Sequence, residues 1–192
     1  HIFTGDGPFC VTAAGACAAN NVVDYMVVAG GGSGHGNGPS TGGGGAGGFR
    51  YFSALSPAGS PLVAPVGETV ATSPYSITVG GGGTTTTTPA GVGSDGSDSV
   101  FSSITSTGGG GGGGYPCIAG ADGGSGGGGG NAFPSPTAGG SASPVTSPAQ
   151  GNDGGDGLVA EAEVVQVWLV QMLHPVQMVV QVELVLIFPM DL

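Results

Sequence analysis

Seven consecutive glycines, residues 108–114, follow a short stretch of strand-forming residues that begins at Ser99. Glycine has no side chain to bury and loses more backbone entropy on ordering than any other residue. Such a run therefore adds nothing to an ordinary hydrophobic core. The chain holds 45 glycines among 192 residues, and none of them lies beyond residue 157. The glycine runs decide what residues 1–157 can fold into.

The long run belongs to a repeated module in which a short β segment leads into polyglycine. Clear copies lie at residues 22–34, 74–83 and 99–114. The β-branched and aromatic residues of "VVDYMVVA" (22–29) and "PYSITV" (74–79) favour strands, and we predict that the first of these is buried. Repetition of this kind favours a stacked array over one globular core.

Further short strands are predicted between the glycine runs. Residues 1–12, "HIFTGDGPFCVT", are typical of a hairpin around a "TGDG" turn, because glycine supplies positive φ there. "FRYFSAL" begins a strand at Phe49, in which Phe49 and Tyr51 are expected to be core residues. "SVFSSIT" forms another strand from Ser99.

Two structures are open to the glycine runs. They could be flexible linkers, because glycine-rich chains behave as random coils. Alternatively, they could adopt the polyproline II conformation, with three residues per turn, and bond side by side through their unpaired amides. Each such hydrogen bond contributes about 0.5–1.5 kcal/mol net. We favour the second structure, because linkers join complete domains and no stretch here is long enough to be one. The predicted fold class is mainly β and irregular, with short strands alternating with polyglycine II-type runs packed as a bundle and no helix-rich domain.

The charge balance excludes two classes of partner. Lys and Arg together number one, Arg50, against twelve Asp and Glu, which gives a net charge of −11. Nucleic-acid binding needs cationic side chains to neutralise phosphates, and docking to an anionic membrane surface needs them too. We therefore expect neither partner.

No constellation in the sequence predicts catalysis or a cofactor. GxGxxG spacings occur by chance in any glycine run, and no lysine is present for a phosphate loop. His1, His35 and His174 are scattered, so no metal triad is readable. No serine has a plausible His–Asp partnership. We expect a protein that is not an enzyme and has no catalytic, cofactor-binding or metal-binding residue.

Two acidic clusters carry an aspartate pair each, Asp95 with Asp98 and Asp153 with Asp156. Both pairs resemble the Gly/Asp calcium repeats of parallel β-rolls, but the nine-residue period of those repeats is absent. Aspartates in glycine-rich turns usually serve the turn itself, and we expect that role here.

Three cysteines, Cys10, Cys17 and Cys117, exclude complete internal pairing. Cys10 and Cys17 could form a bridge across a short loop. The simpler expectation is that all three are small, half-buried thiols.

Three residues are candidates for contact with a binding partner: His35, Tyr115 and Phe133. His35 lies within "GSGHGNG", Tyr115 within "YPC" and Phe133 within "NAFPSP", and we expect all three at loop tips. Exposed aromatic rings offer a large contact area at low entropic cost.

Four motifs in a fixed order carry a family resemblance: "VDYMVVAGGGSG", "GGGGAGGFRY", "YSITVGGGG" and "SVFSSITSTGGGGGGG". Together they resemble the glycine-rich domain of bacteriophage tail-associated proteins, especially marine ones, over residues 1–157. The opening "HIFTGDGPFCV" is similar to the lead-in of that family. The resemblance implies a virion protein at the tail, a structural element or adhesin whose polyglycine II helices carry receptor-binding loops. It implies a host-cell receptor (a glycan or an outer-membrane protein) and other virion tail proteins as partners. By analogy with fibres it also implies a homo-oligomer.

A second class of function stays open, that of a secreted, extracellular glycine-rich structural, fibril or ice-binding protein. Ice binding would favour threonines spaced regularly on a flat face. The threonines at residues 84–88 form one contiguous block instead, which argues against it.

The composition changes at Leu158, and we divide the chain into residues 1–157 (a β lead-in, 1–29, and polyglycine/β repeats, 30–157) and residues 158–192. The last segment is apolar, but its Gln, His and Pro residues disfavour a membrane-spanning helix. In the frame that begins at the third base of each codon, a third-base G joins the first two bases of the next codon. If that next codon encodes Val, Glu or Ala, the new codon encodes glycine. Met178 before Val179 and Met190 before Asp191 force glycine in that frame. We interpret residues 158–192 as a frameshifted tail with no evolved function.

Overall fold

The computed structural model describes residues 1–16, 21–36, 41–56, 63–87, 91–131 and 136–158. Eight short strands and no helix occur in these ranges, which confirms the predicted mainly β and irregular class. The strands are β1 (Gly7–Cys10), β2 (Val22–Val23), β3 (Tyr25–Val28), β4 (Phe49–Phe52), β5 (Glu68–Thr69), β6 (Pro74–Thr78), β7 (Ser99–Phe101) and β8 (Ile104–Ser106).

The strands pair antiparallel in three small sheets, which we call the base. One sheet has the order β1-β6-β7-β8, and the others pair β2 with β5 and β3 with β4. A small apolar core forms around Val27, Val70 and Phe101, with aromatic residues packed against it. Phe9, for example, meets Phe101 edge to face at 6.0 Å between ring centroids.

Four sequence-based predictions about the strands need correction. Residues 1–12 do not form a hairpin of their own, because β1 pairs with β6 and places Phe9 opposite Tyr75. The segment from Ser99 is a hairpin, β7–β8, rather than one strand. Its turn is so tight that Ser102 takes a positive φ of 54°.

The segment 22–29 is also not one buried strand. It divides into β2 and β3, which belong to different sheets. In β3 the side chains alternate, so that Val27 is buried whereas Met26 is 66% exposed. Phe49 and Tyr51 of β4 are half-buried rather than core residues, and their rings stack at 6.0 Å.

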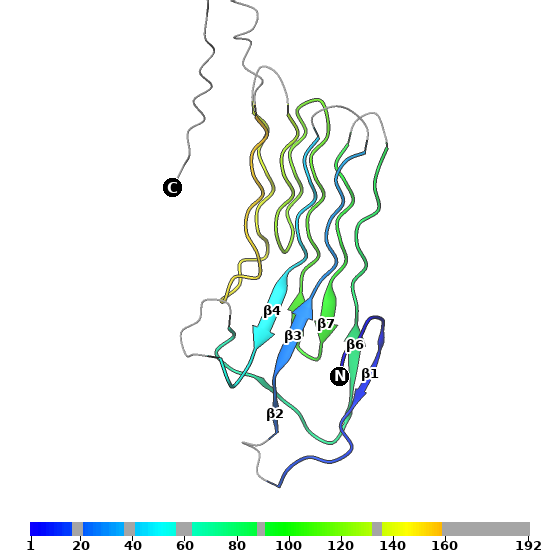
Figure 1. Ribbon diagram of the computed structural model, residues 1–192, viewed down its shortest axis with the longest axis vertical. Coiled ribbons are helices and arrows are strands. Elements are labelled where there is room, and N and C mark those ends of the chain that lie inside the picture. Colours follow the sequence, from blue (N-terminus) through cyan, green and yellow to red (C-terminus); the bar gives the residue numbers. More distant parts are fainter. Residues whose placement is uncertain (17–20, 37–40, 57–62, 88–90, 132–135, 159–192) are drawn as a thin grey trace, which may run out of the picture. The chain divides into compact units, whose positions relative to one another are not determined.

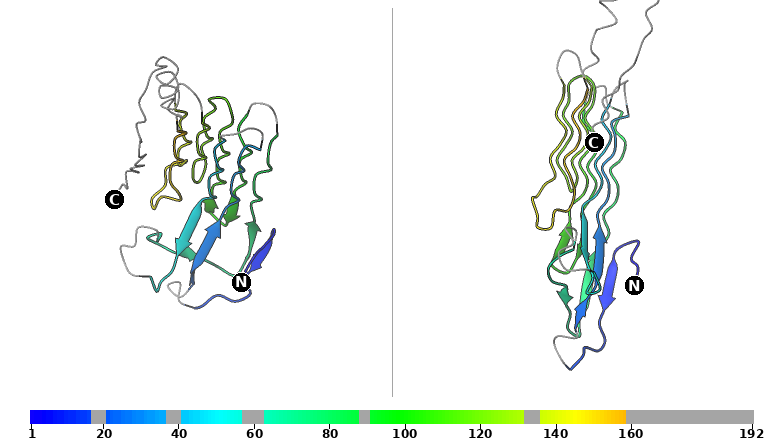
Figure 2. Two further views of the ribbon diagram at one scale, coloured as in Figure 1. Left: turned by 45° about the horizontal axis from the view of Figure 1, so that its top comes forward. Right: turned by 60° about the vertical axis from the view of Figure 1, so that its left-hand side comes forward.

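Glycine-rich runs continue directly from the strands of the base and lie side by side (Figures 1 and 2). We number the nine runs of the described residues along the chain. They are run 1 (29–36), run 2 (41–48), run 3 (79–87), run 4 (91–98), run 5 (107–114), run 6 (118–124), run 7 (125–131), run 8 (136–143) and run 9 (150–158).

Hydrogen bonds between backbones connect each run to its neighbours and define three layers. Runs 3, 1 and 2 form the first layer, runs 4, 5, 7 and 9 the second, and runs 6 and 8 the third. Bonds such as Gly32 N to Gly45 O (2.9 Å) join runs within a layer. Bonds such as Gly109 N to Gly30 O (2.9 Å) join one layer to the next. The predicted side-by-side packing of glycine runs is therefore present.

Run 5 shows the three-residue period of a polyglycine II helix. Gly109 and Gly112 both donate to run 1 and accept from run 4. Gly110 and Gly113 both donate to run 7 and accept from run 2. Residues three apart in run 5 therefore bond to the same neighbouring runs.

Glycine is required in these runs for close approach. A Cβ placed on Gly110 would overlap the carbonyl of Ala121, and one on Gly111 would overlap the carbonyl of Gly93. No glycine whose surroundings are defined has a φ in the left-handed region. The packed runs therefore require glycine because it has no side chain, and not because their backbone conformation is unusual.

Candidate functional site

The ends of the runs farthest from the base form the tip of the bundle. Run 1 ends there at Gly36, run 3 at Thr87 and run 7 at Asn131, and the described connection 115–117 joins run 5 to run 6. Hydrogen bonds fix the flanking run ends beside one another; for example, Gly36 N donates to Thr86 O at 2.8 Å. The bundle thus brings to one end run ends that are far apart in the sequence.

Tyr115 lies at the tip, as its position in the sequence predicted. It begins the connection 115–117, which the structure describes, and it is 48% exposed. The exposed thiol of Cys117 follows two residues later, in a backbone with φ 58°. Cys10 is exposed as well, so the expectation of half-buried thiols is wrong for both; Cys17 lies outside the described residues.

His35 does not lie at an exposed loop tip, so that expectation is wrong. Its side chain is only 4% exposed, because run 1 continues through Gly36 and keeps His35 within the bundle. The ring lies against run 5, where a Cβ on Gly114 would be 3.2 Å from His35 Cγ. Neither ring nitrogen has a hydrogen-bond partner in the described part of the chain. In this conformation His35 fills space beneath the tip. Phe133, the third candidate, lies outside the described residues.

The paired aspartates bond to backbone amides of neighbouring runs. Asp98 Oδ1 accepts from Gly108 N, and Asp95 Oδ1 accepts from Gly111 N, both at 2.8 Å. Gly108 and Gly111 also accept from run 6 through their carbonyls. Every backbone donor and acceptor of residues 108–113 is therefore paired, although all six residues are buried.

The second aspartate pair does the same for run 8. Asp153 Oδ1 accepts from Ala142 N at 2.7 Å, and Asp156 Oδ1 accepts from Gly139 N at 2.9 Å. The turn role that the sequence predicted for these residues is thus incomplete. The missed signal was their spacing, because residues three apart share one face of a polyglycine II helix.

Among the described residues no group of three or more His, Cys, Asp and Glu side chains could hold a metal ion. Over the same residues no helix is long and apolar enough to span a membrane.

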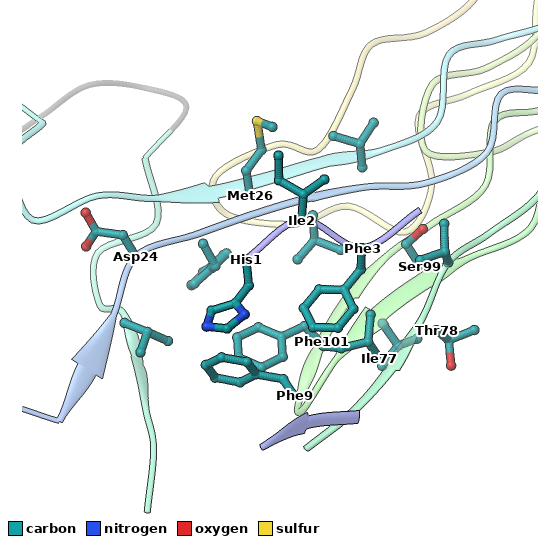
Figure 3. A pocket seen from close by; sticks show the side chains of 16 residues that line it. His1, Ile2, Phe3, Phe9, Asp24, Met26, Ile77, Thr78, Ser99 and Phe101 are labelled. Atoms are coloured by element: carbon teal, nitrogen blue, oxygen red, sulfur yellow. The ribbon is translucent and has the colours of Figure 1, made fainter. Parts of the chain in front are cut away.

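An open cavity of about 520 Å³ lies in the base, between the amino-terminal segment and β3, β6 and β7. In Figure 3 the rings of His1, Phe3, Phe9 and Phe101 gather in one group on one side of the cavity. The lining is mainly apolar, with polar side chains from Asp24, Thr78 and Ser99 among it.

Two polar side chains that line this cavity, Asp24 and Tyr25, interact with neighbouring residues of the base. Asp24 accepts hydrogen bonds from Ser53 Oγ at 2.8 Å and from Ala54 N at 3.0 Å. Burial raises the pKa of the Tyr25 hydroxyl; Arg50 lowers it and Glu68 raises it. Tyr25 therefore stays neutral through the ordinary pH range.

Comparison with known proteins gives one match. The family described as a glycine-rich domain matches residues 4–167. No curated protein matches the chain, and no solved structure does. The matched region covers the base and all nine runs and continues past Gly157, so the chain belongs to the glycine-rich domain family.

Proposed function

We propose that the chain is a non-enzymatic structural and adhesin module of a bacteriophage tail, which presents loops at the tip of its bundle to a receptor on the host cell. The receptor is a glycan or an outer-membrane protein, and the base faces other virion tail proteins.

The observation that carries the proposal is the contrast between the bundle and its tip. Backbone groups of residues 108–113 are all paired inside the bundle, so these residues leave nothing free to bind a ligand. At the tip, Tyr115 in the described connection 115–117 exposes nearly half of its surface. Loops on a rigid scaffold are where binding residues concentrate, and tyrosine is enriched at the energetic centres of interfaces.

A cell-binding experiment tests the proposal. The full chain, carrying a fluorescent label, is titrated onto a panel of Gram-negative bacteria that includes marine isolates, and onto purified surface glycans. We expect saturable binding to a subset of the panel. Tyr115→Ala is expected to weaken binding about fivefold or more, the effect of losing roughly 1 kcal/mol at an interface.

Leu55→Ala is the matched control, because Leu55 is 93% exposed but follows β4 in the base. It is expected to leave binding unchanged. Equal loss with both variants would contradict recognition at the tip. No binding to any cell or glycan, together with inhibition of ice recrystallisation or assembly into fibrils, would favour the alternative of a secreted structural or ice-binding protein.

A further inference from the structure

The six sides of run 5 follow a rule. Around this run, sides that donate alternate with sides that accept. It donates to run 1 and run 7 and accepts from run 4, run 2 and run 6. No described run lies on the sixth side, where the amides of Gly108 and Gly111 donate to Asp98 and Asp95 instead.

Run 7, also in the middle layer, has five neighbouring runs among the described residues, and no described side chain takes the place of a sixth. It donates to runs 2, 6 and 9 and accepts from runs 5 and 8. If donating and accepting sides alternate around run 7 as well, its sixth side, between runs 2 and 9, accepts hydrogen bonds. The carbonyls of Gly126 and Gly129 form that side. No described residue donates to either carbonyl, and both glycines are buried. We call this side of run 7 the open groove.

The open groove has room for more backbone. A Cβ placed on Gly128 would lie 3.5 Å from Gly43 N of run 2 and 3.7 Å from Gly155 O of run 9, which is ordinary van der Waals contact. A Cβ on Gly43 or Gly155 would meet no atom within 4 Å. The two flanking runs therefore border a space that no described residue fills.

The chemistry of the open groove specifies its occupant. Carboxylates complete the sixth side of run 5 because that side presents donors. The open groove presents acceptors, which need N–H groups at every third residue. The whole sequence has no lysine and a single arginine, and Arg50 lies in β4. An amide-bearing segment without side chains, another polyglycine run, fits both the charge and the spacing.

The position of run 9 indicates where that segment comes from. Gly157 donates to Thr137 O at 2.7 Å, and Leu158 N donates to Asn131 Oδ1, so the chain reaches the tip beside the open groove. Runs that follow one another without an intervening strand are neighbours throughout the bundle, and the family match continues to residue 167. Residues 158–167 as they stand hold no glycine. Their Val, Ala and Glu codons would read as glycine in the other frame wherever the preceding codon ends in G.

We propose that the open groove is the seat of a tenth polyglycine run, encoded directly after Gly157 in the alternative reading frame. That run descends antiparallel to run 9 and donates its amides to Gly126 and Gly129. The chain as given has lost it through a frameshift.

The test compares the 192-residue chain with a restored chain, in which the gene's own nucleotides after codon 157 are read in the other frame. Thermal unfolding is followed by circular dichroism. The restored chain is expected to unfold at a Tm at least about 4 °C higher, since roughly 1 kcal/mol shifts Tm by 2–4 °C in a chain of this size. Gly128→Ala is expected to remove that gain in the restored chain and to leave the given chain unchanged.

Gly81→Ala is the matched control, because a Cβ on Gly81 meets no atom within 4 Å and Gly81 lies on run 3, away from the open groove. It is expected to be neutral in both chains. A nucleotide sequence that is poor in glycine codons in the other frame would overturn the proposal. So would equal Tm values for the two chains, or a dimer of the given chain that Gly128→Ala dissociates, since the occupant would then be a second copy.

Discussion

The bundle and the base of this protein are held together by different interactions. In the base, apolar side chains such as Val27, Val70 and Phe101 are removed from water, which stabilises by about 25 cal/mol per Å² of apolar surface. In run 5, residues 108–113 bury no side chain at all, and cohesion comes from their backbone hydrogen bonds. A buried lattice of this kind is stable only if nearly every amide and carbonyl is paired, because an unpaired buried polar group costs about 1–3 kcal/mol.

The comparison also shows why each region needs the other. Glycine has no side chain with which to set a register, whereas strands with one buried face specify theirs strongly. Run 1 continues from β3, run 3 from β6 and run 5 from β8, so the base fixes where each run begins. Ser106, which is fully buried, also bonds the carbonyl of Gly48 and ties the two regions together.

The largest effect is expected from a methyl group in the middle of the bundle. Gly110→Ala would drive a Cβ into the backbone carbonyl of Ala121, so run 5 would have to leave its neighbours, at a cost of about 4 kcal/mol or more. Urea unfolding followed by circular dichroism measures this cost. Gly81→Ala, with open space around its Cβ, controls for the change in glycine content; similar midpoints for the two variants would contradict close packing of run 5.

A similar but slightly smaller effect is expected in the base. Phe101→Ala removes a ring from the apolar core and is expected to cost about 3–5 kcal/mol. Because run 4 leads into β7 and β8 leads into run 5, we expect base and bundle to unfold in one transition, with the exposed Leu55→Ala as control. A separate melting of the base, with the bundle signal retained, would show that the two regions are independent.

Substitution of Asp95 and Asp98 tests whether the bundle is stabilised by pairing of its backbone groups, because it leaves the glycine content unchanged. Replacing both Asp95 and Asp98 by alanine leaves the amides of Gly111 and Gly108 without their acceptors, at about 1–3 kcal/mol for each amide. The double asparagine variant keeps an acceptor oxygen at each position and is expected to recover most of the loss. Equal destabilisation by both double variants in a urea titration would assign the effect to charge instead.

The smallest effect concerns the base at alkaline pH. The pKa of Tyr25 is raised by burial, so its contribution to stability is present below the pKa of a free tyrosine, about 10. That contribution is lost as the pH rises through the folded-state value. Tyr25→Phe is expected to flatten the fall in urea midpoint between about pH 9 and 11. An unchanged slope would mean that Tyr25 does not titrate in the folded base.

The sequence predicted the two kinds of region but not their connections. Strands such as 74–78 followed from β-branched and aromatic residues, and lateral bonding of the glycine runs followed from their unpaired amides. The order of runs in the layers could not be predicted, because identical glycines carry no information about which neighbour they meet. His35 was misplaced for a related reason: nothing in "GSGHGNG" shows where run 1 ends.

The aspartate pairs were the most informative signal that the sequence interpretation did not use. Asp95 and Asp98 stand three residues apart, which is one turn of a polyglycine II helix. Together they mark the side of run 5 where no described run lies. Segments 22–29 and 99–106 each divide into two strands because of how these strands pair with other strands of the fold. The local β propensity of the residues does not specify that pairing.

Amide hydrogen exchange of the full chain, measured residue by residue by NMR, tests the central claim most directly. If backbone pairing between runs holds the bundle together, the amides of residues 108–113 exchange as slowly as those of β6 and β7, because both open only when the fold is lost. Exchange of residues 108–113 at the rate of an unstructured chain, with β6 and β7 still protected, would contradict the account.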